Sequence, residues 1–386
     1  MNYLGYSEKR LKELDGYWTA KEIEQQPASW MRTHAYLAAN AIRIREFLGP
    51  LLARDDLRII LTGAGTSAFV GACLAPSLSR ILGRQLEAIP TTDLVSGPDQ
   101  NFHRNVPTLL VSFARSGNSP ESVAAVELAS SMLAECHQLV VSCNAEGNLF
   151  GLCKDRPHCL ALLMPEETND RAFAMTSSFS CMLLAAIEVF TGIEAFGASV
   201  SHVSSLVEDF IRTRSESIRV LADNNFSRVI YLGSNGMAGL AREASLKLLE
   251  LTDGRVLTTH ESSLGVRHGP KSVLNEDSLV VIFMSADPHT RKYDTDIYNE
   301  LVADRQVKRI VALTPLAEPR FNGAEHFTIG TGEKLTDLEL LFPYAVFAQI
   351  YGFHQALKIG NRPDNPSAAG TVNRVVQGVN IYACKS

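Results

Sequence analysis

The chain of 386 residues lacks the features that mark several specialised protein classes. No apolar run approaches the ~20 residues needed to cross a bilayer. Residues 1–27 are polar and acidic, without the basic start and apolar stretch of a signal peptide. Positive charge is not in excess, since the net charge is −6, which argues against a nucleic acid or an anionic membrane as partner. We therefore expect a cytoplasmic protein that binds neither.

The cysteines form no C-x-x-C pair, and their number is odd. The seven are Cys73, Cys136, Cys143, Cys153, Cys159, Cys181 and Cys384. Several lie in apolar surroundings such as VVSCN and SFSCML, so we expect reduced, mostly packed thiols without metal or redox use. Zinc-ligand spacing is also missing around His260, Glu261 and His268. We expect neither a metal nor another cofactor.

Apolar segments are arranged as an α/β protein would have them. Residues 1–50 predict helices, the last ended by Gly49-Pro50. Strand-like segments then alternate with helix-like ones. The pattern starts again at FSRVIYLGSNG, which, like LRIILTGAG, is an apolar strand that runs into glycines. The other expected strands are QLEAIPTTDL, PTLLVSFARSG, HQLVVSCN, SLVVIFMS and VKRIVALTP, and C-terminal helices are expected from about Leu335. We predict an N-terminal helical segment (1–50) and two tandem α/β domains (51–215 and 216–386), each a doubly wound, mainly parallel sheet flanked by helices.

Three charged residues lie at helix spacing in LAREASLKLLELT. Glu243, Lys247 and Glu250 occupy positions i, i+4 and i+7, which share one face of a helix. The rest of the segment is mostly Ala and Leu, so we expect a buried helix whose charges must be paired or used. With His268 on a following loop, the stripe is either an acid–base site or a structural ion pair. Spacing alone does not separate the two.

The first strand of the alternating region runs into Gly63, Gly65, Thr66 and Ser67 before a helix. Glycines let the backbone approach a ligand, and a helix N-terminus offers free N–H groups to an anion. A nicotinamide site is disfavoured, because the second strand ends in threonines where an acidic residue is expected. Helix capping would explain one of the two hydroxyls, not both.

The third strand ends in SFARSGNSPES, which places hydroxyls, an arginine and a glycine in one strand-to-helix turn. Such turns lie at the carboxyl edge of a parallel sheet, where ligands bind. Hydroxyls and N–H groups suit a phosphate monoester, and Arg115 could supply charge. Ser119 followed by Pro120 also caps a helix, which explains one serine but not the cluster. The candidate phosphate-binding residues are Gly65, Thr66, Ser67, Arg115, Ser116, Asn118 and Ser119.

The chain resembles the sugar isomerase (SIS) domain family in four motifs and in their order: Gly-Thr-Ser, A-R-S-G-N-S-P-E-S, E-x-x-x-K-x-x-E and R-H-G-P. The resemblance extends over essentially the whole chain, as two tandem SIS domains. Glu22-Ile23 and Gln26-Pro27 resemble the lead-in of the isomerase half of glucosamine-6-phosphate synthase. The segments SFARSGNSPES, ESSLGVRHGPKS and NPSAAGTVNRVVQG resemble bacterial galactosamine-6-phosphate deaminases/isomerases, also called tagatose-6-phosphate ketose/aldose isomerases.

The resemblance implies roles for individual residues. Hydroxyls of the first domain would hold the sugar phosphate: Thr66, Ser67, Ser116 and Ser119. Glu250 would shuttle a proton between C1 and C2, with Glu243 and Lys247 holding and tuning it. His268 would open the sugar ring from a neighbouring subunit, which implies a homodimer or a larger assembly with shared active sites.

The chain also departs from the synthase pattern. Arg115 stands where the synthase has glutamine, and Thr371 stands where it has an active-site lysine. The second domain's loop, residues 233–236, lacks the Gly-Thr-Ser pair, so we expect only the first domain to hold phosphate.

The resemblance implies a deaminase/isomerase of amino-sugar catabolism. Its expected substrate is D-galactosamine 6-phosphate, and its expected products are D-tagatose 6-phosphate and ammonia. The alternatives are an aldose–ketose isomerase of a hexose phosphate without nitrogen and a non-catalytic sugar-phosphate sensor. Sensors of this kind usually carry a helix-turn-helix domain or lose the carboxylate, and this chain has neither feature.

Overall fold

The computed structural model describes residues 2–154, 156–315, 325–330, 334–367, 369–376 and 378–383. The chain divides into two compact units. The first-sheet unit comprises 28–170, 175–201 and 369–386, and the second-sheet unit comprises 1–27, 171–174 and 202–368. Each unit is thus built from several separate stretches of the chain. The domain limits that we drew from the sequence (1–50, 51–215 and 216–386) remain predictions. No helix in the described ranges is long and apolar enough to cross a membrane.

The N-terminal region is helical after a short hairpin. Its elements are β1 (Asn2–Tyr3), β2 (Tyr6–Ser7), α1 (Glu8–Glu13), α2 (Tyr17–Glu24), α3 (Gln26–Ala39) and α4 (Ala41–Leu52). The expected stop at Gly49-Pro50 was wrong, because α4 continues to Leu52 with Pro50 inside it. A proline normally clashes with the Cβ of the residue before it, and Gly49 has none. Both residues are exposed, so water can solvate the carbonyl that Pro50 leaves without an N–H.

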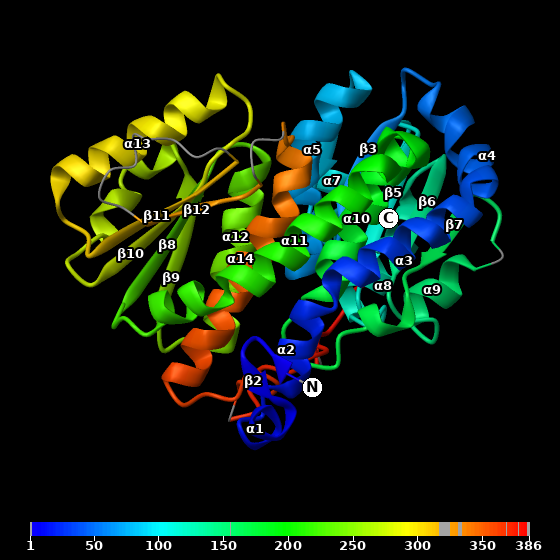
Figure 1. Ribbon diagram of the computed structural model, residues 1–386. Coiled ribbons are helices and arrows are strands. Elements are labelled where there is room, and N and C mark those ends of the chain that lie inside the picture. The colour runs from blue at the N-terminus through cyan, green and yellow to red at the C-terminus, as the bar shows by residue number, and fades with distance from the viewer. Residues whose placement is uncertain are drawn as a thin grey trace. The chain divides into compact units, whose positions relative to one another are not determined.

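The first sheet has five parallel strands in the order β4-β3-β5-β6-β7 (Figure 1). These are β3 (Arg58–Thr62), β4 (Leu86–Ala88), β5 (Thr108–Ala114), β6 (Cys136–Ser142) and β7 (Cys159–Leu163). The predicted strand QLEAIPTTDL was too long. Only Leu86–Ala88 forms a strand, because Pro90 precedes a helix that begins at Thr91. A proline at that place pre-forms the turn into the helix.

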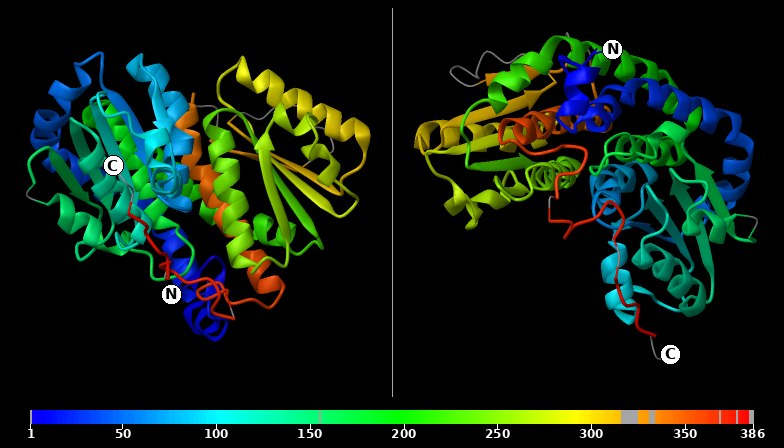
Figure 2. Two further views of the ribbon diagram at one scale, coloured as in Figure 1. Left: turned by 180° about the vertical axis from the view of Figure 1, so that it is seen from behind. Right: turned by 90° about the horizontal axis from the view of Figure 1, so that it is seen from below.

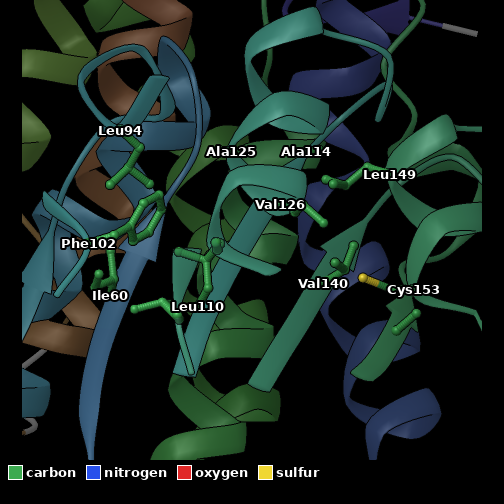
Figure 3. Packing of buried hydrophobic residues seen from close by; sticks show 13 residues of the cluster. Ile60, Leu94, Phe102, Leu110, Ala114, Ala125, Val126, Val140, Leu149 and Cys153 are labelled. Carbon is green, nitrogen blue, oxygen red and sulfur yellow. The ribbon is translucent and has the colours of Figure 1, made fainter. Parts of the chain in front are cut away.

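Helices flank the first sheet. They are α5 (Thr66–Leu82), α6 (Thr91–Ser96), α7 (Pro98–Asn101), α8 (Pro120–Met132), α9 (Asn148–Cys153) and α10 (Ser177–Thr191), with a 3-10 turn at Glu166–Thr168. The long helix α11 (Ile193–Ala222) begins in this unit and belongs to the second-sheet unit from residue 202 onward. On one face, Ile60, Leu110 and Val140 of the strands pack against Leu149 and Cys153 of α9 and against residues of α6 and α8 (Figure 3). Alternate strand residues face opposite sides, so the other set is left for α5 and α10.

The second sheet repeats this arrangement in the order β12-β11-β10-β8-β9, again parallel throughout. Its strands are β8 (Arg228–Gly233), β9 (Leu257–Ser262), β10 (Ser278–Phe283), β11 (Arg309–Thr314) and β12 (Glu325–Thr328). The helices are α12 (Gly236–Leu251), α13 (Thr290–Asp304) and α14 (Asp337–Lys358), with 3-10 turns at Gly265–Arg267 and Pro270–Val273. In this unit α14 runs alongside α12 (Figure 2). The edge strand β9, LTTHES, was not predicted because it is polar and partly exposed.

The predicted fold class is confirmed, with two parallel five-stranded sheets flanked by helices. In each sheet the chain leaves its first strand to one side and then crosses to the other. This gives a topological switch point between β3 and β5, and another between β8 and β10. Ligands of open parallel sheets bind outside the carboxyl ends of the strands at such points.

Candidate functional site

The loop between β3 and α5 has the backbone expected of a ligand-binding turn. Gly65 has a φ of +55°, and a Cβ on Gly63 would lie only 2.6 Å from the Ser67 carbonyl carbon. Both positions therefore need glycine. The helix-capping alternative was wrong here, since Gly65 is the N-cap without a side-chain bond and Thr66 is the first residue of α5.

Buried hydroxyls without partners gather around this loop. Thr66 Oγ1 is buried and makes no hydrogen bond within the described part of the chain. The same is true of Thr62, Thr91 and Ser112. Thr62 and Ser112 are register partners at the ends of β3 and β5, and Thr91 N donates to Gly63 O at 2.8 Å. A buried, unsatisfied hydroxyl costs about 1–3 kcal/mol, so this cluster indicates a site built for a polar ligand.

Sequence reasoning selected Thr66 and Ser67 but missed Thr62 and Thr91 as site residues. The missed threonines sit in segments that look like ordinary strand and turn. Their shared place at the switch point follows only from the sheet order. Ser67 itself is buried, and its hydroxyl contacts Met175 Sδ at 3.9 Å.

The turn after β5 places the second set of candidate residues. Gly117 has a φ of +68°, and a Cβ there would lie 3.2 Å from Gly147 Cα. Ser116 Oγ accepts from Asn118 N at 3.3 Å, and Ser116 is only half-buried. Asn118 Oδ1 accepts from Asn148 N at 3.0 Å, so this side chain braces the turn. Ser119 caps α8 as predicted, accepting from Ser122 N at 3.3 Å, with Pro120 in the first turn.

Arg115 is buried at the end of this strand, with 6% of its surface exposed. Its Nη2 donates to the Arg374 carbonyl oxygen at 2.7 Å. Arg374 in turn donates through Nε to Asp170 O at 2.8 Å and through Nη2 to Asn169 Oδ1 at 2.9 Å. The guanidinium of Arg115 therefore fastens the C-terminal segment that contains Thr371. A direct phosphate contact by Arg115 remains a prediction.

The charged stripe on α12 forms one connected group. Lys247 Nζ lies 3.6 Å from Glu243 Oε1 and is paired with Glu250 Oε2. The exposed fraction is 1% for the Lys247 side chain and 3% for Glu243, but 22% for Glu250. The ammonium of Lys247 thus pairs with two carboxyl groups of the same helix. Glu250 is the accessible end of this group, and is therefore the carboxylate that can meet a substrate.

α12 is apolar because it is covered on both sides within its unit. Leu240, Ala244 and Leu248 are buried, and the helix packs against β8, β9 and α14. A Cβ on Gly352 of α14 would lie 3.0 Å from Leu251 Cδ1, so the two helices approach closely. The stripe is thus held rigidly, since neither helix can turn without opening the core.

No hydrogen bond or ion pair joins the side chains of His268 and Glu250 in the part of the chain that the structure describes. His268 ends the 3-10 turn Gly265–Arg267 and is exposed. None of the described residues forms a hydrogen bond with its imidazole. Its loop is nevertheless fixed, because Arg267 Nε donates to Glu300 Oε2 at 2.7 Å and Lys271 pairs with Glu300 and Asp304.

The switch point of the second sheet is already filled by a carboxylate. Asp294 is fully buried on α13 and accepts from Ser234 Oγ at 2.6 Å, Ser263 Oγ at 2.5 Å and Ser285 N at 2.9 Å. Burial raises the pKa of Asp294, and these hydrogen bonds oppose the rise. The loop donors that could face a phosphate therefore face Asp294 instead.

The lead-in residues Glu22 and Gln26 have structural contacts in the second-sheet unit. Glu22 accepts from Arg171 N at 2.6 Å and from Ala172 N at 3.2 Å. Gln26 Nε2 donates to Gln349 Oε1 at 2.7 Å. Both side chains thus tie distant segments of this unit together.

Comparison with known proteins agrees with this architecture. Residues 51–191 match the SIS domain family model. The chain is 43% identical over 368 residues to the D-galactosamine-6-phosphate deaminase AgaS of Escherichia coli, covering 95% of this chain and 96% of that one. It belongs to the AgaS family of SIS-domain proteins. The AgaS protein of Shewanella sp. (strain ANA-3), also named a D-galactosamine-6-phosphate deaminase, is 42% identical over 379 residues, 97% of this chain and 94% of that one.

A solved structure extends the match to three dimensions. The crystal structure of tagatose-6-phosphate ketose/aldose isomerase from Escherichia coli superposes with a TM-score of 0.89 at 39% identity, covering 96% of this chain and 98% of that one. The resemblance drawn from the motifs is therefore confirmed.

Proposed function

We propose that this AgaS-family protein is a D-galactosamine-6-phosphate deaminase that forms D-tagatose 6-phosphate and ammonia. Members at 42–43% identity over most of the chain are named for this deamination. The observation that carries the proposal is the α12 group, in which the partly exposed Glu250 pairs with the buried Lys247.

The first-sheet unit would bind the phosphate. Thr66, Ser67, Ser116 and Ser119 lie at the switch point between β3 and β5, and the unpaired hydroxyls of Thr62, Thr91 and Ser112 add further donors. The N-terminal N–H groups of α5 favour an anion there. The second-sheet unit would bind none, because Asp294 occupies its loop donors and would repel a phosphate.

Glu250 would move the proton at the reacting carbons. In the open-chain sugar, the C1 aldehyde acidifies the proton on C2, and Glu250 removes it to give an enolamine. The same carboxyl returns a proton at C1, which leaves an imine at C2. Water adds to that imine and ammonia leaves, so the ketose phosphate remains. One carboxylate suffices because C1 and C2 are adjacent, and general acid–base catalysis of this kind contributes about 10²–10⁴-fold.

Lys247 and Glu243 would act through Glu250. The ammonium of Lys247 pairs with the carboxylate of Glu250 and holds its orientation, and Glu243 Oε1 lies 3.6 Å from the same ammonium. The steps are proton transfers, the addition of water and the loss of ammonia.

His268 would open the sugar ring, as a residue supplied by a second copy of the chain. Its exposed position on a loop held by the Arg267–Glu300 ion pair supports this arrangement. The protein would then be a homodimer or larger assembly. Mixing inactive Glu250→Gln and His268→Gln variants tests it, because subunit exchange should restore part of the activity. No restoration despite demonstrated exchange would contradict a shared site.

A second candidate is simple aldose–ketose isomerisation, favoured by the name of the E. coli structure. It would use the same base and the same ring-opening histidine. A panel of hexosamine and hexose 6-phosphates, assayed for ammonia and ketose together, separates the two activities. Ketose formation without ammonia from every amino sugar would overturn the deaminase proposal.

The role of Glu250 is tested in the same assay with Glu250→Gln. The amide keeps the size of the side chain but cannot take the C2 proton, so kcat should fall by about 10²–10⁴-fold while sugar-phosphate binding persists. Glu261→Gln, on the neighbouring edge strand β9, is the matched control and should keep activity. Substantial ammonia release by Glu250→Gln would show that another residue is the base.

A further inference from the structure

Arg374, in the C-terminal segment 369–376, contacts two parts of the first-sheet unit at once. Its main-chain oxygen accepts from Arg115 Nη2 at 2.7 Å, where the turn after β5 begins. Its side chain donates through Nε to Asp170 O at 2.8 Å and through Nη2 to Asn169 Oδ1 at 2.9 Å. All four residues belong to the first-sheet unit, so these bonds lie within one compact body.

Asp170 extends this connection to the loop after β3. Its buried carboxylate accepts from Thr176 N at 2.8 Å and from Thr176 Oγ1 at 3.2 Å, which fixes the chain where α10 begins. Met175, the residue before Thr176, accepts through Sδ from Ser67 Oγ at 3.9 Å. The contacts of Arg374 thus join the two loops that carry the candidate phosphate-binding residues.

The guanidinium of Arg374 serves geometry and not charge pairing. Its acceptors are a carbonyl oxygen and an amide oxygen, and it forms no ion pair with any residue of the described ranges. A planar fork of N–H donors fits two acceptors in fixed positions, and a lysine ammonium does not reproduce that fit. The half-buried side chain therefore holds its own carbonyl oxygen in front of Arg115.

We propose that Arg374 is a positioning residue of the phosphate site, which ties the loop after β3 to the turn after β5. A phosphate is held by several donors at once, so its affinity depends on how well those donors are placed before it binds. The tie sets the spacing of the hydroxyls on the two loops. Because the ligand of these loops comes from the proposed function, the consequence for binding rests on that function, whereas the tie itself does not.

Calorimetry with inorganic phosphate tests the tie without turnover. Arg374→Ala should weaken phosphate binding about tenfold, and Arg374→Lys, which keeps the charge but loses the fork, should recover little of it. The matched control is Arg84→Ala. Arg84 is also half-buried and donates to two carbonyls, Arg54 O at 2.7 Å and Leu52 O at 3.1 Å, before β4 at the amino edge of the same sheet.

The control should lower the unfolding temperature and leave phosphate affinity unchanged. Wild-type affinity in Arg374→Ala would overturn the proposal. Full recovery in Arg374→Lys would assign the effect to charge alone and would also overturn it.

A double-mutant cycle separates positioning from a direct phosphate contact by Arg115. Arg115→Met removes the donor to Arg374 O and keeps an unbranched side chain. If Arg115 acts through the tie, the double variant Arg115→Met/Arg374→Ala should bind phosphate about as weakly as the weaker single variant. Effects that multiply would mean that the two arginines act separately, which contradicts the tie.

The enzyme assay separates this role from a general structural defect. Arg374→Ala should raise the KM for the sugar phosphate about tenfold and leave kcat nearly unchanged, because the Glu250 helix is not altered. Arg84→Ala can reduce only the folded fraction, which lowers the apparent kcat at an unchanged KM. That second pattern in Arg374→Ala would contradict a positioning role.

Hydrogen exchange measures the tie without any ligand. In Arg374→Ala the amides at 65–68 and 116–119 should exchange several-fold faster than in the wild type, and in Arg84→Ala they should not. Unchanged exchange at both loops in Arg374→Ala would overturn the proposal. If the wild type bound no phosphate, the proposed function would fail, and this measurement would still decide whether Arg374 holds the two loops.

Discussion

Lys247 Nζ lies 3.6 Å from Glu243 Oε1 at a place on α12 where both side chains are buried. Removing one partner of such a pair leaves a buried, uncompensated charge. Lys247→Met should therefore lower the free energy of unfolding by about 3–5 kcal/mol, measured by urea denaturation. The double variant Lys247→Met/Glu243→Gln leaves less uncompensated charge and should recover part of the loss. An equal loss in both would mean that the pairing contributes little.

The unpaired hydroxyl of Thr66 predicts opposite effects on stability and binding. Thr66→Val keeps the shape and removes a buried group that has no partner in the described chain, so the unfolding free energy should stay level or rise by up to about 1 kcal/mol. Affinity for the sugar phosphate should fall at least about tenfold, as for a lost hydrogen bond to a charged group. Calorimetry measures both.

The matched control for Thr66 is Thr33→Val in α3. The Thr33 hydroxyl is buried but donates to Ser29 O at 2.9 Å, so this change should destabilise the protein and leave phosphate affinity unaltered. If Thr66→Val also destabilised the protein and left phosphate affinity unaltered, the Thr66 hydroxyl would have a structural role and would not bind the ligand.

A buried glutamate of α10 should make stability depend on pH. Burial raises the pKa of Glu188 from 4.5 to about 7, and the His34 ring at 2.9 Å opposes the rise. A raised folded pKa means that the contribution of neutral Glu188 is complete below pH 4.5 and is lost as pH rises through about 7. Over that window the wild type should lose about 3 kcal/mol more than Glu188→Gln.

Denaturation curves at several pH values measure this difference. Glu127→Gln on the exposed face of α8 should follow the wild-type pH dependence and serves as the control. Parallel curves for wild type and Glu188→Gln would show that Glu188 is ionised in the folded protein throughout.

Much of the fold could be predicted because it depends on short-range patterns. Apolar strands alternating with helices gave the parallel α/β class, and the spacing of Glu243, Lys247 and Glu250 gave their shared helix face. The prediction of mostly packed cysteines is confirmed for the six from Cys73 to Cys181, four of which are buried. Cys384 lies outside the described residues. Errors arose where one residue changed a local rule, as when Gly49 allowed Pro50 inside α4.

The site depends more on contacts between distant residues. Asp294 reaches Ser234 across 60 positions, and Arg115 reaches Arg374 across 259. No local sequence pattern predicts either hydrogen bond, because the packing of the sheet and its helices determines which groups meet. The gathering of Thr62, Thr91 and Ser112 is of the same kind.

The sequence by itself determined which segments become strands, which turns carry glycines and hydroxyls, and which charges share a helix face. These properties follow from side-chain periodicity and backbone sterics, which act over a few residues. Only the tertiary structure decided that Glu250 is the accessible carboxylate of its group and that Asp294 takes up the loop donors at the second switch point. Burial and partner choice depend on the whole packed unit, so a residue's chemistry is set by neighbours that its sequence position does not reveal.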